Sequence, residues 1–219
     1  MRMKRDEDSR QIWQAFQLRL NMDTLSLNAR RIWFAVPVTV LLSATVAAAD
    51  SDLPRGGKEN STMSMMITSP SFKHNGTIPS IHTCDGPNIS PQLEWTGLPA
   101  GTKSLALVVD DPDAPDPAAP KMTWVHWVLY NIPADSAGLP EGATAEMLPS
   151  GTLQGLNDWR RTGYGGPCPP KGKHRYFFKL YALDVALPDL KQPGKSNLEK
   201  AMQGHVLARS ELVGLYQRH

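Results

Sequence analysis

The chain has 219 residues, which is enough for one ordinary domain preceded by an N-terminal extension. Its formal net charge is +2 and 41% of its residues are hydrophobic, a composition that excludes a disordered chain and a multi-span membrane protein. Residues 1–49 hold seven Lys and Arg but only four Asp and Glu, so the rest of the chain is close to neutral. No basic stripe remains there to bind nucleic acid.

The extension has the pattern of a secretory signal. Arg30 and Arg31 precede a short apolar run, Ile32 to Val46, which ends at the small residues Ala47 to Ala49. The run is shorter than the roughly 20 apolar residues that span a bilayer comfortably. We therefore expect export to the periplasm or the medium after cleavage near Ala49, with a retained membrane anchor as the alternative.

Two boundaries follow from this interpretation. Met22 would give a more compact signal than Met1, and the sequence leaves the choice of start open. Residues 50–64 are polar and contain glycine, which is typical of a flexible lead-in. Residues 65–219 then form the domain, which we expect not to span a membrane.

The domain is predicted to be all-β. Its apolar runs are short and are separated by Gly- and Pro-rich turns, which is the rhythm of an antiparallel β sandwich and not of alternating strands and helices. The predicted strands are Gln92–Trp95, Ser104–Val109, Thr123–Ile132 and His174–Leu183.

Only the C-terminal segment has a helical pattern. Ser196 is a candidate N-cap and Glu199 follows three residues later, as in a capping box. Apolar residues then recur at roughly helical spacing on both sides of Gly204. We expect two short helices here; the apolar positions are Leu198, Met202, Val206, Leu207 and Leu212.

Period-two alternation assigns the faces of the two long strands. In the first, Trp124, His126, Val128 and Tyr130 share one face, and Thr123, Val125, Trp127 and Leu129 share the other. Both faces are largely apolar, so the strand is predicted to be central and His126 to lie inside or at the floor of a pocket. In the second, one face carries His174, Tyr176, Phe178 and Leu180.

Two segments hold the residues able to carry chemistry. In Val108 to Pro115, a strand ends in acidic residues separated by prolines, which hold Asp111 and Asp113 in fixed positions. In Gly163 to Tyr176, glycines permit close approach of a ligand to the backbone, and prolines stiffen the turn before a strand that begins with histidine. Imidazole and phenol groups with backbone N–H groups can form a phosphate or carboxylate pocket.

Other interpretations of these residues stay open. Judged from the residues alone, His126 and His174 are more typical of core histidines whose hydrogen bonds are satisfied by neighbours. His126, His174 and Asp111 together have the ligand types of a metal site but lack the usual local spacing, so no metal is predicted. Cys84 and Cys168 can form a disulfide after export, although sequence alone does not show whether they meet. Cys168 beside a histidine is also a candidate nucleophile.

The ordered combination of these segments resembles the phosphatidylethanolamine-binding protein family, in its bacterial Raf-kinase-inhibitor-like branch. The resemblance rests on DPDAP at 111–115, the spaced His126 and GPCPPKGKHRY at 166–176, and it extends to TCDGPNISP at 83–91, Asn157-Asp158 and the ending LVGLY at 212–216. It covers roughly residues 65–218.

The resemblance implies a Greek-key β sandwich with short C-terminal helices and a pocket for a small anionic group, a phosphate headgroup or a carboxylate. Carried over residue by residue, it also implies a set of pocket residues and leaves Tyr216 as a weaker match for a tyrosine that closes the pocket. The implied set is Asp111, Asp113, His126, Cys168, Pro169, Pro170, His174 and Tyr176.

We therefore predict a binding protein without catalytic residues, cofactor or metal. Its ligand is the small anion, and a protein partner at the pocket rim is the second expectation, since eukaryotic relatives inhibit kinases or proteases. A third hypothesis is a weak hydrolase in which Asp111 and His126 act as an acid–base pair.

Overall fold

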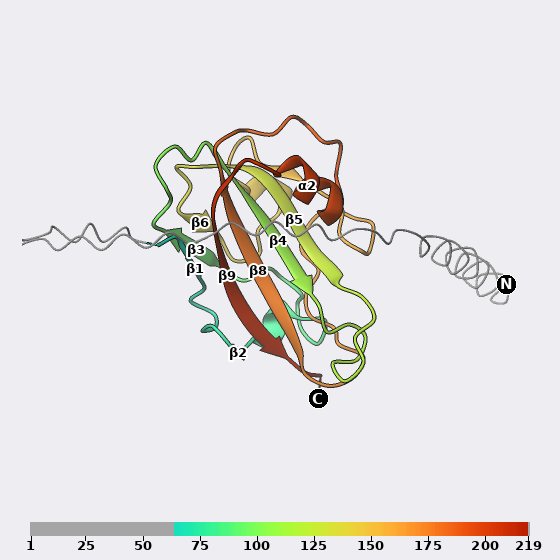
Figure 1. Ribbon diagram of the computed structural model, residues 1–219. Coiled ribbons are helices and arrows are strands. Elements are labelled where there is room, and N and C mark those ends of the chain that lie inside the picture. The colour runs from blue at the N-terminus through green and yellow to red at the C-terminus, as the bar shows by residue number, and fades with distance from the viewer. Residues whose placement is uncertain (1–63, 219) are drawn as a thin grey trace, which may run out of the picture. The chain divides into compact units, whose positions relative to one another are not determined.

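The structure, a computed structural model, describes residues 64–218 (Figure 1). The predicted secretory signal at 1–49, and the lead-in up to residue 63, lie outside the described residues. Nine strands form two sheets in the described part of the chain. The smaller sheet has the order β1 (Met66–Thr68), β3 (Leu93–Thr96), β6 (Gly138–Leu139). The larger has the order β2 (Gly76–Thr77), β9 (Val206–Tyr216), β8 (His174–Leu183), β4 (Ser104–Asp111), β5 (Trp124–Pro133), β7 (Leu153–Gln154).

The predicted all-β class is confirmed. The long strands β9, β8, β4 and β5 run side by side as one antiparallel layer (Figure 1), and among the strands of residues 64–218 only the short β2–β9 pair is parallel. Three short helical segments complete the described fold: the 3-10 helices η1 (Ser80–His82) and η2 (Ala145–Met147), and helix α2 (Lys195–Ala201).

The main core lies between the two sheets. The small sheet contributes Ile67, Leu93, Trp95 and Leu139, which pack against the inner face of the large sheet. A second, smaller core lies on the outer face of the large sheet, where α2 places Leu198 beside Val108 and Val128. The central strands are therefore buried on both sides, as their apolar sequences predict.

The four predicted strands are all present, and the predicted His174–Leu183 matches β8 to the residue. The strand predicted at 104–109 continues to Asp111, so that the two aspartates at its end belong to the sheet. The alternation in β8 is also confirmed, since Tyr176, Phe178 and Leu180 share the main core and His174 is buried.

The prediction of a second C-terminal helix is wrong. Residues 206–216 form strand β9, which pairs antiparallel with β8 from His174–Tyr216 to Leu183–Val206. The backbone groups on one edge of β8 need partners, and this pairing outweighs a weak helical spacing. The capping box is also wrong, because Gly194 and not Ser196 precedes α2, and no side chain caps the helix.

The face assignment in β5 fails at one point, near His126. Trp127 pairs with Val109 and Val125 with Asp110, so His126 is an extra residue that has no partner in the ladder with β4. This β-bulge moves Val125 to the second core, with Val128 and Tyr130, instead of the face it was predicted to share with Trp127. A bulge next to a candidate site re-aims a side chain, here His126.

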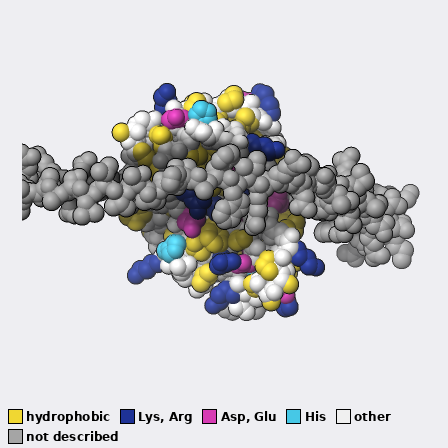
Figure 2. Space-filling model, viewed as in Figure 1, with side chains coloured by type: hydrophobic (Ala, Val, Ile, Leu, Met, Phe, Trp, Pro, Cys, Tyr) yellow, Lys and Arg dark blue, Asp and Glu magenta, His cyan; other side chains and the backbone are white. Residues whose placement is uncertain are grey.

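The visible surface shows no single charged region. On the parts of this face that Figure 2 leaves uncovered, Lys and Arg side chains are scattered among hydrophobic and neutral ones. Among residues 64–218, no helix is long and apolar enough to cross a bilayer.

Candidate functional site

A cavity of about 320 Å³ lies at the end of the sheet where β4 stops and β5 and β8 begin. We call it the imidazole cavity, because both His126 and His174 line it. The structure thus brings together the two segments that the sequence singled out. The remaining lining residues are Asp111, Ala114, Pro115, Met122, Trp124, Trp159, Cys168, Pro169 and Pro170.

Asp111 and His174 form a buried pair at this cavity. His174 Nδ1 lies 2.7 Å from Asp111 Oδ2, and both side chains are almost completely buried. His174 Nε2 lies 3.0 Å from the carbonyl oxygen of Lys171. A carboxylate and a carbonyl only accept hydrogen bonds, so both contacts are satisfied when both ring nitrogens carry protons. The geometry therefore fits an imidazolium that is neutralised by Asp111.

Asp113 has a different position from the one expected. It is buried but does not line the cavity, and its carboxylate accepts hydrogen bonds from Arg175 Nε at 2.9 Å and Nη2 at 2.7 Å. These bonds hold the pKa of Asp113 below its usual value. The Asp113 N–H also donates to Asp111 Oδ1 at 2.8 Å. Asp113 thus fastens the turn to β8 and supports Asp111.

His126 has one satisfied nitrogen and one without a partner. Nδ1 lies 2.6 Å from the carbonyl oxygen of Gly165, which can only accept, so Nδ1 carries a proton. Nε2 is buried and has no hydrogen-bond partner among the described residues. Burial lowers the pKa of His126, and this effect is larger than the opposing effects of the Gly165 bond and Asp111. The favoured state is therefore neutral, with a lone pair on Nε2.

Tyr176 was predicted to line the pocket, but it is not among the residues that line the imidazole cavity; it lies against two that are. Its ring contacts His126 edge to face at 5.2 Å and stacks on His174 at 6.4 Å between centroids. The hydroxyl forms no hydrogen bond of good geometry within the described part of the chain, although it lies near the Asp111 carboxylate. Burial, followed by the charge of nearby Asp111, raises the pKa of Tyr176, so the group stays a neutral donor. Unpaired buried polar groups are rare and call for an explanation.

The sequence did not identify Trp159 as a site residue. The centroid of its ring lies 5.1 Å from that of His126 and 5.4 Å from that of Trp124. Trp159 forms one wall of the cavity, and 40% of the residue is exposed. A Cβ at Gly165 would collide with the Trp159 ring, so glycine is needed there for this approach. The sequence did contain a signal for this residue, since Asn157-Asp158, which is part of the family resemblance, directly precedes Trp159.

Asn157 and Asp158 explain how that wall is held. Asn157 Oδ1 accepts from the N–H groups of Trp159 and Arg161, and its amide donates to the carbonyl of Gly163. Asp158 Oδ2 accepts from the Val125 N–H at 2.7 Å, and the Asp158 N–H donates back to Val125. The turn that carries Trp159 is thereby joined to β5 beside the bulge.

The question of the two cysteines is resolved by the structure: Cys84 and Cys168 form a disulfide. The Cys84 N–H also donates to the Pro167 carbonyl, and the Gly166 N–H to Asn88 Oδ1. These contacts join the turn at 83–88 to the Cys168–Pro170 wall of the cavity. A cysteine within a disulfide has no thiolate, so Cys168 does not act as a nucleophile in this state.

Tyr216 does not reach the cavity; its hydroxyl donates to Asp85 Oδ2 at 2.7 Å. On the outer face of the sheet, Asp110 accepts hydrogen bonds from Lys195 at 2.6 Å and from Lys179 at 2.8 Å.

Among residues 64–218, no three His, Cys, Asp or Glu side chains lie close enough together to hold a metal ion. Asp110 and Asp111, which are adjacent in β4, thus point to opposite faces of the sheet: Asp110 pairs with two lysines on the outer face, and Asp111 pairs with His174 at the imidazole cavity.

The sequence was compared with family models and with known proteins. Residues 68–217 match the family model described as phosphatidylethanolamine-binding protein. A UPF0098 protein of Methanothermobacter thermautotrophicus is 54% identical over 157 residues, which are 70% of this chain and 99% of that protein. A UPF0098 protein of Aquifex aeolicus is 47% identical over 158 residues, covering 70% of this chain and 89% of that protein.

Two solved structures are similar in fold. A Chlamydia trachomatis homologue of phosphatidylethanolamine-binding protein has a TM-score of 0.66 and 41% identity. The Escherichia coli protein YbcL, described as a new member of the mammalian PEBP family, has a TM-score of 0.64 and 35% identity. Each comparison covers 71% of this chain and 99% of the other.

Proposed function

This chain belongs to the phosphatidylethanolamine-binding protein family, and we propose that it binds a small anionic group, a phosphate headgroup or a carboxylate, in the imidazole cavity. The observation that carries the proposal is a pair of buried polar atoms without a hydrogen bond: Nε2 of His126, which lines the cavity, and Oη of Tyr176, whose ring contacts His126. A bound anion would accept a hydrogen bond from each of them.

Binding in this way requires a proton. In the free protein Nε2 of His126 carries a lone pair, which repels an anion. A protonated Nε2 instead donates a hydrogen bond to the anion. The anion replaces the lost hydration and favours the charged imidazole, so the pKa of His126 should rise on binding. Affinity should therefore increase as the pH falls, by up to about tenfold per pH unit where free His126 is neutral.

The rest of the cavity supports this role. The Asp111–His174 pair is neutral as a unit, and both His174 nitrogens already have partners, so it orients Tyr176 without competing for the anion. The walls are mainly apolar, from Trp124, Trp159 and Pro170, and they keep water away from the bound group. An anion of only a few atoms should still bind weakly.

Two substitutions test the proposal with little risk to the fold. His126→Asn removes Nε2 while its amide can still donate to Gly165, and Tyr176→Phe removes only a hydroxyl that forms no hydrogen bond of good geometry. Each should weaken acetate binding at least fivefold, measured by NMR titration between pH 6 and 8, where acetate keeps a constant charge. Titration calorimetry with phosphorylethanolamine should show the same ranking.

Tyr216→Phe is the matched control for Tyr176→Phe, because its hydroxyl bonds Asp85 outside the cavity. It should leave acetate affinity unchanged. Equal affinity of the wild type, His126→Asn and Tyr176→Phe would refute the assignment, as would an acetate affinity that does not vary with pH.

We also propose that the domain is exported. The Cys84–Cys168 disulfide supports this, since disulfides persist mainly in oxidising compartments. N-terminal sequencing of the protein purified from its native cell tests the proposal: a mature N-terminus close to Asp50 is expected, and an intact residue 1–49 segment would contradict it.

A protein partner is the second candidate. At the mouth of the imidazole cavity Trp159 is 40% and Met122 49% exposed, and exposed large apolar side chains grouped around a pocket are typical of interaction sites. A partner recovered by cross-linking in the native compartment should be lost with Trp159→Ser while acetate binding persists. Retention of the partner by that variant would exclude the rim as its site.

A further inference from the structure

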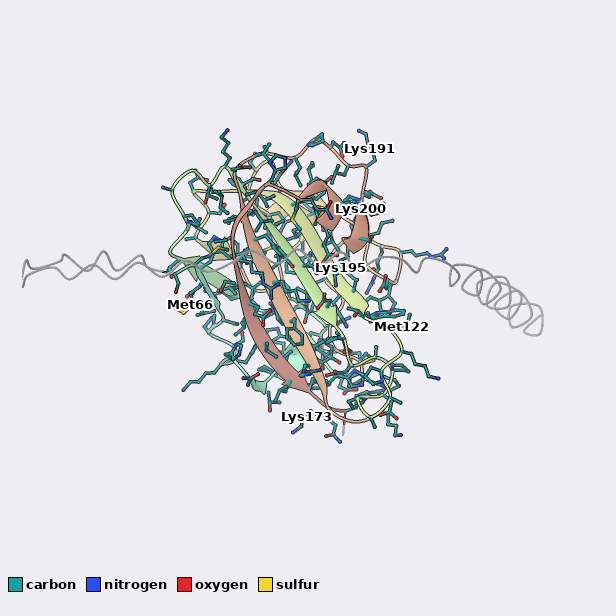
Figure 3. The ribbon with its side chains drawn as sticks, in the orientation of Figure 1. Met66, Met122, Lys173, Lys191, Lys195 and Lys200 are labelled. Atoms are coloured by element: carbon teal, nitrogen blue, oxygen red, sulfur yellow. A yellow bond between two sulfur atoms is a disulfide. The ribbon has the colours of Figure 1, made fainter. Side chains whose placement is uncertain are left out.

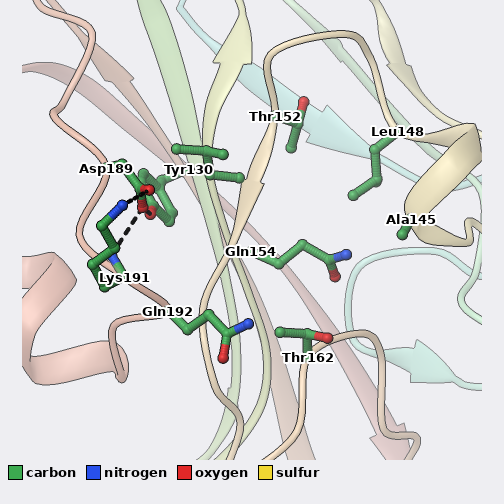
Figure 4. Close-up of a pocket in the computed structure, with 10 residues that line it drawn as sticks. Tyr130, Ala145, Leu148, Thr152, Gln154, Thr162, Asp189, Lys191 and Gln192 are labelled. Carbon is green, nitrogen blue, oxygen red and sulfur yellow. Dashed lines mark hydrogen bonds and ion pairs between the residues drawn. The ribbon is translucent and has the colours of Figure 1, made fainter.

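A second cavity, larger than the first, lies at another part of the domain. Its volume is about 600 Å³ and it shares no lining residue with the imidazole cavity (Figure 4). Figure 3 labels one lining residue of each, Met122 of the first and Lys191 of the second, at well-separated places. We call the second one the amide cavity, after Gln154 and Gln192, which line it with Thr152 and Thr162.

The amide cavity is electrically neutral. The charged side chains that line it are Asp189 and Lys191, which form an ion pair with each other at 2.6 Å. Asp189 also accepts a hydrogen bond from the Tyr130 hydroxyl. No charge is left over to select an anion or a cation, and the lining has no counterpart of His126, whose unpaired Nε2 distinguishes the imidazole cavity.

Uncharged hydrogen-bonding groups converge on the cavity from three separate segments. Gln154 comes from β7, Gln192 from the loop before α2, and Thr162 from the turn that carries Trp159. Figure 4 shows the polar ends of Gln154, Gln192 and Thr162 close to a common space. Within the described chain none of the three side chains forms a hydrogen bond. Each can both donate and accept, so together they offer a neutral ligand alternating partners.

The loop that supplies Gln192 is held in an unusual conformation. Lys191 and Gln192 are consecutive non-glycine residues in the left-handed region, with φ of 57° and 59°. Residues that have a Cβ rarely adopt this backbone conformation, and strained residues of this kind are concentrated at functional sites. The loop is fixed by Asn131, whose amide bonds the Leu187 backbone in both directions, and by the bond from the Leu190 N–H to Tyr130.

Thr152 adds a further polar group. Its hydroxyl is buried and has no hydrogen-bond partner among the residues described, although the residue lines the cavity. Leu148 and Leu153 supply apolar surface beside it. A ligand that suits this lining presents both hydroxyl or amide groups and C–H surface, without net charge.

From these observations we propose that the amide cavity binds a neutral saccharide. A sugar ring presents hydroxyl groups that donate and accept, and C–H faces that pack on leucine. The cavity volume lies in the range of roughly 300–1,000 Å³ that is usual for small-molecule sites. An extended peptide fits less well, because β7 has only two residues and the flanking N–H groups of Thr152 and Leu156 already bond Pro149 and Pro193.

The test uses the protein in NMR titrations with three neutral probes: triacetylchitotriose, which carries hydroxyl and acetamide groups, maltotriose, and a blocked trialanine peptide. At least one saccharide should bind saturably with a dissociation constant in the millimolar range or below. Gln154→Ala and Gln192→Gly should each weaken that binding at least fivefold. Gln192→Gly also suits the left-handed backbone, so it should fold at least as well as the wild type.

Two controls separate this proposal from the anion site. Gln203→Ala removes an exposed glutamine outside the cavity and should leave saccharide binding unchanged. His126→Asn should also leave it unchanged while it weakens acetate binding. The proposal is overturned if neither saccharide binds saturably, if the two cavity variants bind like the wild type, or if only the peptide binds.

Discussion

The two cavities of this domain are built on opposite principles. The imidazole cavity depends on buried groups: the almost completely buried Asp111–His174 pair, the unpaired His126 Nε2 and the neighbouring Tyr176 hydroxyl, with one wall held by a disulfide. The amide cavity has its charges exposed and paired, in Asp189 and Lys191, and its free groups are neutral. A buried charge interacts strongly with the charge of a ligand because water does not screen it, whereas an exposed ion pair discriminates little between ligands of different charge.

The strongest way to break this comparison is to remove one ion-pair partner in each cavity. Asp111→Ala removes the buried partner of His174 Nδ1 and should lower the free energy of unfolding by about 3–5 kcal/mol. Lys191→Gln removes the exposed partner of Asp189 and should cause no measurable change. Urea denaturation of both variants measures the difference. Similar losses in the two variants would show that burial does not separate the cavities.

The disulfide offers the next largest effect. The double variant Cys84→Ser/Cys168→Ser opens a loop whose ends are 84 residues apart, and should cost about 2–4 kcal/mol of stability. Because Cys168 lines the imidazole cavity, acetate affinity should also fall there, while saccharide binding at the amide cavity should be retained. Loss of both affinities in a folded variant would show that the cavities are not independent.

The smallest effect is a pH dependence that belongs to the imidazole cavity alone. His126 has a lowered pKa in the folded protein, whereas in the unfolded chain it takes up a proton near pH 6.5. Below that pH the unfolded state therefore binds more protons, so this residue reduces stability as the pH falls, by at most about 1.4 kcal/mol per pH unit. His126→Asn should flatten the stability curve between pH 7 and 5, measured by urea denaturation in acetate-free buffer. An unchanged slope would mean that the pKa of His126 does not differ between the folded and the unfolded protein.

Much of the fold and the candidate site could be predicted from local patterns. Continuous apolar runs ended by glycine and proline located β4, β5 and β8, because a strand buried on both faces needs such a run. The proline-separated aspartates and the Gly–Pro turn pointed to Asp111, His126, Cys168 and His174, which the structure gathers around one cavity. Asp113 was expected with them but serves Arg175 instead.

The sequence by itself thus determined the all-β class, the long central strands and the two turns that carry the site residues, since each depends on a short stretch of chain. Only the tertiary structure decided the β9 strand, the bulge at His126, the Cys84–Cys168 bridge, the Trp159 wall and the amide cavity. Each of these joins segments far apart in sequence, and their stability comes from pairing and burial with those distant partners. No periodicity within one segment carries that information.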